Sequence, residues 1–324
     1  MRLARACAPA RALAAALATV AACLLVIGCG APLPASDGET PIALAPGVFM
    51  VRGRSGEADR DNQGRIGNTG FIVGETGVIA IDTGTSYRHG QALLAQIART
   101  TDRPVRLALI THTRPEFLFG ANAFRERGIP IGMHRKAAQL MAARCEICLK
   151  TLKRTLGDEA MAGTTMFEPD EVFDESHTLH TIGRPLRIVY LGHSSGPGDV
   201  AVLDEASGVL FAGGLLDERR IPDVVDGDLA GWRRALDRLG SLPLSRIVPG
   251  HGPVASAAVI AEVARYLERL QTRVAQLLGA GASLADVPDA AALPDYASWD
   301  QYDTIHRRNA AIVFVRLERE LLAK

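Results

Sequence analysis

The apolar segments in the first part of the chain are short and bounded by glycine or turn residues, as strands usually are. They predict strands over residues 42–51, 70–74, 77–82 and 105–110. Before the last of these, Leu93, Leu94 and Ile97 recur at helical spacing and predict a helix over residues 88–100. The last strand is almost continuously apolar, which indicates that it is buried on both faces.

Strand and helix patterns alternate again through the rest of the chain. Single strands are predicted over residues 129–132 and 246–248, and strand pairs over residues 178–191 and 200–211. Further helices are predicted over residues 121–126, 135–157, 228–239, 256–278 and 299–322. Two successive halves, each with strands followed by strand–helix alternation, favour two packed sheets with helices outside. We therefore expect one domain of the α/β (α+β) class over residues 41–324.

The first 28 residues have the pattern of a secretory signal. Three arginines within the first eleven residues precede an apolar run over residues 12–27. The run is followed by Gly28 and Cys29, which resembles a bacterial lipobox, where small residues precede a lipid-modified cysteine. We therefore expect lipidation at Cys29; the alternative is an ordinary signal peptide cleaved near Ala31.

The signal is followed by a short tether over residues 29–40, which contains proline, serine and glycine. Together these segments predict an exported, periplasmic protein that touches the membrane only through a lipid anchor. Because the signal holds three arginines and no acidic residue, the remainder has a small net negative charge. It has no run of lysine or arginine, so nucleic acid is not an expected partner.

Two of the five cysteines lie close together after the tether, at Cys145 and Cys148. An exported chain meets an oxidising compartment, so this pair is a possible disulfide. Two half-buried thiols three residues apart on a helix are the alternative. A zinc site at this pair would need two further ligands, and none is near in the sequence.

Three histidines, His112, His193 and His251, stand directly after predicted strands. Loops at sheet edges usually carry functional side chains. A single histidine in a globular chain is usually structural, but three at strand ends indicate a common site. Their local contexts are Ile110-Thr111-His112-Thr113, Leu191-Gly192-His193-Ser194-Ser195-Gly196-Pro197-Gly198-Asp199 and Val248-Pro249-Gly250-His251-Gly252-Pro253.

These three segments, with Asp82-Thr83-Gly84 before them and Phe211-Ala212-Gly213-Gly214 between them, resemble the metallo-β-lactamase-fold hydrolases in order and spacing. The resemblance covers residues 42–255. It implies an αββα sandwich, in which two mixed β-sheets are flanked by helices. It also implies hydrolysis by zinc-activated water at a site between the sheets.

Two other segments resemble a narrower branch of these hydrolases. They are the segment from Cys145 to Thr164 and the C-terminal motif over residues 303–309. The branch is that of the quinoprotein relay system zinc metallohydrolases, related to the sulfur-oxidation SoxH proteins. This resemblance implies a role in a periplasmic oxidation pathway.

The family signature H-x-H-x-D-H reads His112-Thr113-Arg114-Pro115-Glu116-Phe117 in this chain. The resemblance places His112 and His193 at two ligand positions of the first metal, with Arg114 at the third. At the second metal, His251 matches a ligand position.

The remaining ligand positions of the second metal are altered. The resemblance implies that Glu116 replaces an aspartate, Phe117 replaces a histidine, and Gly214 replaces the aspartate that bridges both metals. We therefore expect no dinuclear site and either no zinc or one zinc. A single zinc would be held by the three histidines, with Glu116 as a ligand or catalytic base.

Arginine is permanently cationic and has no lone pair to offer a metal. We expect Arg114 to occupy the space of the lost metal and to pair with Glu116. Its guanidinium would then suit a small anionic ligand, because its geometry matches carboxylate and phosphate groups.

Asp82 and Asp199 match family positions that orient the ligand loops; strand capping and turn formation are the alternative. Two functions remain open. One is a zinc-dependent hydrolase acting on a small substrate. The other is a non-catalytic ligand-binding or accessory protein on the same fold.

Overall fold

The computed structural model describes residues 40–323, which belong to one compact unit. The signal segment, Cys29 and residues 29–39 of the tether lie outside the described residues, so the expectations about them stay predictions. Within residues 40–323, no helix is long and apolar enough to cross a membrane.

The first sheet has seven strands that lie in chain order. They are β1 (Ile42–Ala45), β2 (Val48–Val51), β3 (Thr69–Val73), β4 (Val78–Ile81), β5 (Val105–Ile110), β6 (Ile131–His134) and β7 (Glu171–Phe173). The strands from β1 to β4 pair antiparallel, and those from β4 to β7 pair parallel. The single strand expected over residues 42–51 is instead a hairpin, because Gly47 turns the chain with φ of +76°.

The second sheet has five strands in the order β12-β11-β10-β9-β8. They are β8 (His177–Leu179), β9 (Leu186–Tyr190), β10 (Val200–Asp204), β11 (Val209–Gly213) and β12 (Arg246–Pro249). The pair of β11 and β12 is parallel and the others are antiparallel. Both sheets are therefore mixed, as expected.

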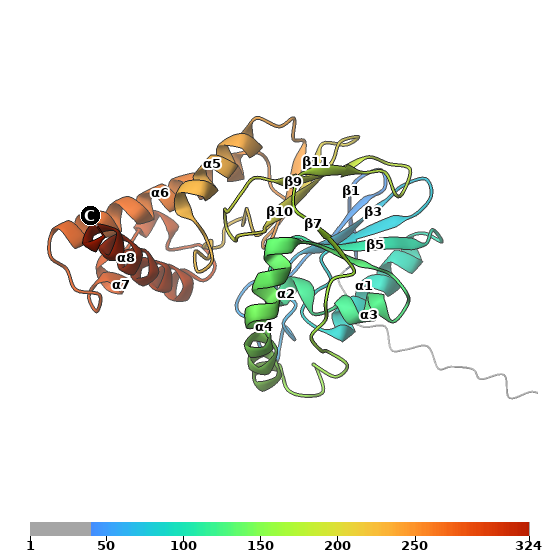
Figure 1. Cartoon of the computed structure of the whole chain (residues 1–324), viewed down its shortest axis with the longest axis horizontal. Coiled ribbons are helices and arrows are strands. Elements are labelled where there is room, and N and C mark those ends of the chain that lie inside the picture. Colours follow the sequence, from blue (N-terminus) through green and yellow to red (C-terminus); the bar gives the residue numbers. More distant parts are fainter. Residues whose placement is uncertain (1–39, 324) are drawn as a thin grey trace, which may run out of the picture. The chain divides into compact units, whose positions relative to one another are not determined.

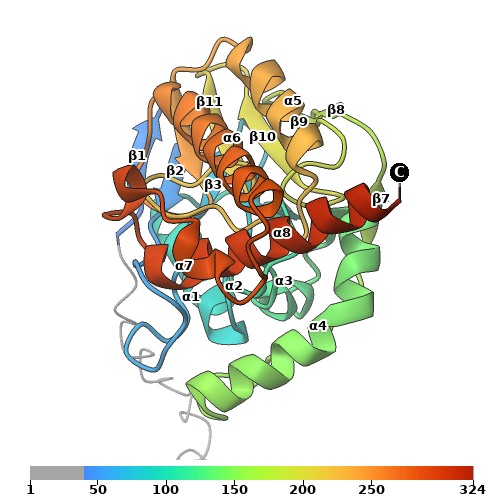
Figure 2. The ribbon, with the colours of Figure 1, turned by 90° about the vertical axis from the view of Figure 1, so that its left-hand side faces the viewer.

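Helices cover the outer faces of the two sheets (Figure 1). They are α1 (Tyr87–Thr100), α2 (Pro115–Leu118), α3 (Ala121–Arg125), α4 (Arg135–Leu156), α5 (Leu229–Gly240), α6 (Ala258–Gly279), α7 (Val287–Ala290) and α8 (Arg307–Leu322). The expected helix over residues 299–322 is shorter than predicted, because residues 302–306 form a turn of π-helix before α8. Helices α6 and α8 contact each other (Figure 2).

Three hydrophobic clusters hold these layers together. One joins the inner faces of both sheets and includes Ile79, Ile81 and Val202. Another packs the first sheet against α1, α3 and α4, and the third packs the second sheet against α5, α6 and α8. Side chains alternate between clusters along a strand, since Val78 and Ala80 face the helices. The expected αββα sandwich is confirmed.

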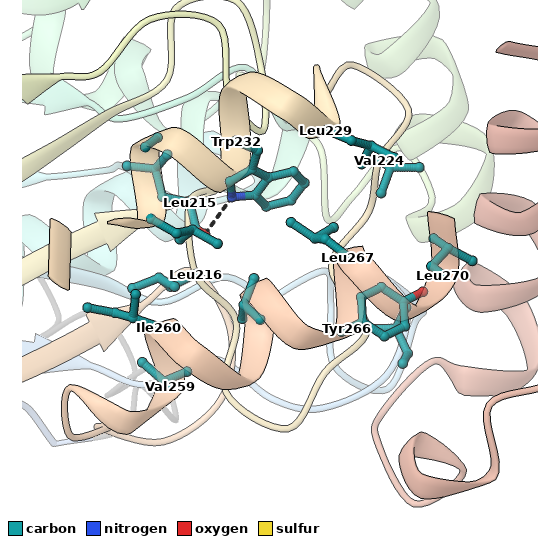
Figure 3. Packing of buried hydrophobic residues seen from close by; sticks show 14 of the residues in the cluster. Leu215, Leu216, Val224, Leu229, Trp232, Val259, Ile260, Tyr266, Leu267 and Leu270 are labelled. Atoms are coloured by element: carbon teal, nitrogen blue, oxygen red, sulfur yellow. Dashed lines mark hydrogen bonds between the residues drawn. The ribbon is translucent and has the colours of Figure 1, made fainter. Parts of the chain in front are cut away.

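The cluster around Trp232 shows how α5 and α6 attach to the second sheet (Figure 3). Trp232 is almost fully buried, and its indole Nε1 donates a hydrogen bond of 3.0 Å to the carbonyl oxygen of Leu215. The bond satisfies the one polar atom of this large apolar side chain. It also anchors the start of the segment that connects β11 to α5, which carries part of the site.

Candidate functional site

The site lies where β4, β5, β11 and β12 end, because each of these strands is followed by one of the candidate residues. His112 and Phe117 follow β5, Gly214 follows β11, and His251 follows β12. Aromatic contacts of Phe117 with both histidines show that these strand ends meet.

His112 is almost fully buried, with 1% of its surface exposed. Its Nδ1 lies 3.0 Å from Thr111 Oγ1, whereas its Nε2 has no hydrogen-bond partner among the described residues. Burial, followed by the nearby charge of Arg114, lowers the pKa of His112 well below its usual value. The imidazole is therefore neutral, and its Nε2 is free to bind a ligand.

The ring of Phe117 contacts both imidazoles. Its centroid lies 4.1 Å from that of His112 and 5.3 Å from that of His251. The short helix α2 carries this ring inward, beginning at Pro115, a residue suited to a first helical position. Gly67 has no side chain at the back of the ring, where a Cβ would lie 2.8 Å from Phe117 Cζ. An apolar ring thus packs directly against both histidines.

His251 lies between two carboxylates. Its Nδ1 is 2.8 Å from Asp217 Oδ1, and its Nε2 is 3.2 Å from Glu116 Oε1, although this second contact is not aligned as a hydrogen bond. Burial by itself would lower the pKa of His251, but the charge of Asp217 and the contacts to both carboxylates raise it. Burial by itself would raise the pKa of Glu116. The contact between Glu116 and His251, together with the charge of Arg114, outweighs burial and lowers the pKa of Glu116 to about 2.

Arg114 pairs with Asp223 rather than with Glu116. Its Nη1 lies 2.8 Å from Asp223 Oδ2, and its Nη2 donates to the Asp223 carbonyl oxygen at 2.9 Å. The expected pair with Glu116 is wrong, because residues two apart at the start of a helix point to different sides. Arg308 of α8 donates to the same Asp223 carboxylate.

Asp82 and Asp199 are both buried beside the site. Asp82 accepts hydrogen bonds from the backbone N–H and the hydroxyl of Thr111, which fixes the residue before His112. Asp199 accepts a hydrogen bond of 2.6 Å from Ser195 Oγ. Burial raises the pKa of Asp82 to about 8 and that of Asp199 to about 6. Asp82 therefore supports the His112 loop, and Asp199 supports the loop that carries His193.

Gly214 lies against the other side of His112. A Cβ at this position would lie 2.7 Å from His112 Cδ2 and 3.0 Å from Asp199 Oδ2. Real Cβ contacts are rarely so short, so a side chain here would displace His112 or Asp199.

His193 has a different environment from the other two histidines. Its side chain is exposed, and its Nε2 lies 2.7 Å from the carbonyl oxygen of Asp226, to which it donates. Within the part of the chain that the structure describes, no group of three or more His, Cys, Asp or Glu side chains is arranged to hold a metal. The structure thus brings His112, Glu116 and His251 together, and does not show His193 with them.

Three residues that contact or support the site residues were not identified from the sequence, namely Asp217, Asp223 and Asn309. Asn309 accepts from the backbone N–H of Val224 and donates to the Pro222 carbonyl oxygen at 2.6 Å, so it holds the segment that carries Asp223. The C-terminal motif that contains Asn309 was noticed, but its spacing does not reveal its target. The acidic residues lie in a loop with no periodic pattern.

Comparison with known proteins agrees with this fold. The family model of the metallo-beta-lactamase superfamily matches residues 62–251, more than half of the chain. The chain therefore belongs to this superfamily. The match includes His112, His193 and His251 and ends before α6.

Two individual proteins are also similar to this chain. A linear primary-alkylsulfatase from a Pseudomonas species is 23% identical over 229 residues, which cover 60% of this chain and 43% of that protein. The chain thus spans less than half of the length of that relative. A metallo-beta-lactamase structure from Pontibacter korlensis superposes with a TM-score of 0.59 and 20% identity, covering 70% of this chain and 98% of that one. This likeness shows the fold.

The two carboxylates beside His251 predict a raised pKa for this histidine, which can be measured in protein freed of metal by dialysis against a chelator. We expect histidine NMR titration to give His251 a pKa above its ordinary value, and Asp217→Asn to lower it, because an opposite charge is removed. His306, whose pKa burial lowers, is the internal control and should not respond. A His251 pKa that is insensitive to this substitution would contradict the assignment.

The contact between His251 and Asp217 also predicts how the free energy of unfolding depends on pH. A raised pKa means that the folded state binds the proton more tightly, so this stabilisation is complete below the unfolded pKa and is lost as pH rises through the folded pKa. The cost of Asp217→Asn, about 1.5–3 kcal/mol for a bond to a charged group, should therefore be largest near pH 6. Urea unfolding at several pH values measures this trend.

A third prediction distinguishes the roles of the two arginines that bind Asp223. Arg114 is 21% exposed and Asp223 10%, so Asp223→Ala leaves a largely buried cation without its carboxylate and should cost about 2–4 kcal/mol of unfolding free energy. Arg308 is 50% exposed, and Arg308→Met should cost less than about 1 kcal/mol. Equal losses in the two variants, measured by chemical denaturation, would show that Arg114 does not depend on this carboxylate.

Proposed function

We propose that this chain is a hydrolase-like member of the superfamily with a depleted metal site, which holds at most one zinc and mainly binds a small molecule. The observation that carries this proposal is the contact of the Phe117 ring with both His112 and His251. A phenyl ring has no donor atom and fills space that a metal with its water would need.

The donor set supports the same proposal. His112 and His251 offer two imidazoles, and Glu116 offers one carboxylate that already faces His251. Arg114 adds a fixed positive charge that lowers the pKa of His112. A pair of zinc ions needs several neutral or anionic donors around two dications, so these residues do not fit a dinuclear centre.

A mononuclear zinc hydrolase is the second candidate. The unpartnered Nε2 of buried His112 favours it, because a buried polar atom without a partner calls for an explanation such as a bound ion. His112 and His251 would hold the ion, with His193 as the third expected ligand. Bound zinc would supply activated water. Glu116, whose carboxylate lies 3.2 Å from His251 Nε2, would be the residue positioned to accept a proton from that water.

We propose a small anion as the ligand class. Arg114 has five N–H donors, and Asp223 engages its Nη1 and Nη2 while the side chain stays 21% exposed. The alkylsulfatase relative is named for linear primary alkyl sulfates, which are anions of this kind. Dodecyl sulfate is therefore a suitable first compound for a binding measurement, with Arg114→Met as the variant that should weaken binding.

We also propose export to the periplasm as a lipoprotein lipidated at Cys29, in a periplasmic oxidation pathway. The arginine-led apolar segment of residues 1–28 supports export, and the branch resemblance of the C-terminal motif supports the pathway. Fractionation of cells that express the full chain tests this, with Cys29→Ala expected to release the protein from the membrane fraction.

The metal content of the full chain tests the depleted site. We expect elemental mass spectrometry after zinc dialysis to find at most one zinc per chain, because the residues around His112 and His251 cannot satisfy two dications. Two zincs per chain would overturn the proposal.

Two variants distinguish the candidates. If one zinc binds at the site, His112→Ala and His251→Ala should each abolish it, which would favour the mononuclear hydrolase. If neither substitution changes the metal content, the ligand-binding role is favoured. His180→Ala is the matched control, since His180 lies in a surface loop after β8 and should not affect zinc binding.

A further inference from the structure

Helix α4 carries two free thiols on one side. Cys145 and Cys148 are three residues apart, and their sulfur atoms lie 3.3 Å from each other. Cys145 is buried, with 1% exposed, and belongs to the cluster under the first sheet. Cys148 is half-buried at the edge of that cluster. One sulfur is therefore accessible from solvent, and the second lies directly behind it.

The two thiols differ in acidity. The contact with Cys145, aided by the charge of Arg144, lowers the pKa of Cys148 to about 7. The same contact and burial raise the pKa of Cys145. The accessible sulfur is thus the one that forms a thiolate, and thiolates are the nucleophiles in disulfide exchange.

The helix opposes a permanent crosslink between these residues. Side chains three apart on a helix have Cβ atoms about 5–6 Å apart, whereas a disulfide needs about 3.5–4.5 Å. A bridge here must tighten one turn of α4. It also closes a very short loop and gains little from restricting the unfolded chain. Exchange between dithiol and disulfide is therefore more favourable than a structural bridge.

The surface beside Cys148 suits a transient partner. The neighbouring Ile147 is 70% exposed and offers an apolar contact directly beside Cys148. Arg144, one residue before Cys145, adds a positive charge that is partly balanced by its ion pair with Asp226. An incoming disulfide would meet an apolar contact and an accessible sulfur at the same place.

We propose that Cys145 and Cys148 form an exchangeable dithiol that reacts with small disulfides, with Cys148 as the attacking sulfur and Cys145 as the resolving one. The Cys148 thiolate bonds to one sulfur of the incoming disulfide and releases the other half as a thiolate. Cys145, after losing its proton to solvent, then attacks Cys148 and releases the second half. The two cysteines lose two electrons and two protons, and the small disulfide is reduced to two thiols.

The experiment uses the full chain, first reduced and then exposed to oxidised glutathione. Trypsin cleaves after Arg144 and Lys150, so the peptide of residues 145–150 carries both sulfurs and separates them from the other cysteines. Mass spectrometry should show this peptide lighter by two hydrogen atoms and without glutathione, and dithiothreitol should reverse the change. A peptide that stays reduced or keeps glutathione overturns the proposal.

Two variants assign the roles. Cys145→Ala should trap glutathione on Cys148, whereas Cys148→Ala should lower the rate of modification of the peptide about tenfold or more, because Cys145 is buried and its pKa is raised. Equal rates in the two variants would contradict the proposed order of attack. Alanine is used because a buried free cysteine packs as a small apolar residue. If a variant does not fold, the reversible change in the unsubstituted chain still decides whether exchange occurs.

Discussion

The ion pair between Arg114 and Asp223 joins the two halves of the sandwich at the site. Arg114 extends from the end of β5, whereas Asp223 lies between β11 and α5, and Arg308 of α8 binds the same carboxylate. The pair keeps a cation in a largely buried position, where its charge helps to keep His112 neutral. His251, which also contacts the Phe117 ring, lies beside two carboxylates that favour its protonated form. The site thus contains two histidines whose pKa values are shifted in opposite directions.

Much of the fold could be predicted because strand and helix periods are local properties. The predictions over residues 77–82, 105–110 and 135–157 nearly match β4, β5 and α4. The hairpin within residues 42–51 was missed although Pro46-Gly47, a common turn pair, stands in the middle of it. Strand β7 was missed because its residues are partly exposed and lack an apolar pattern. Its place in the sheet depends on pairing with distant β6, which no local pattern encodes.

The site could be predicted only as far as local motifs reach. The family resemblance led to His112, Glu116, Phe117 and His251, which the structure brings together. The partner of Arg114 could not be found in this way, because the two residues are 109 apart in the chain. Ion pairs between residues far apart in the chain follow no fixed sequence spacing. Their pairing depends on how whole helices and strands pack. The metal content and the ligand stay predictions.

Gly214 limits which substitutions the site can accept. Any side chain there would crowd His112 or Asp199, and His112 in turn packs on Phe117. A carboxylate therefore cannot be introduced at this position by one substitution without moving its neighbours. Mutations at these positions are epistatic, so their order matters. The absence of a side chain at Gly214, directly after β11, thus constrains which neighbouring residues can change independently.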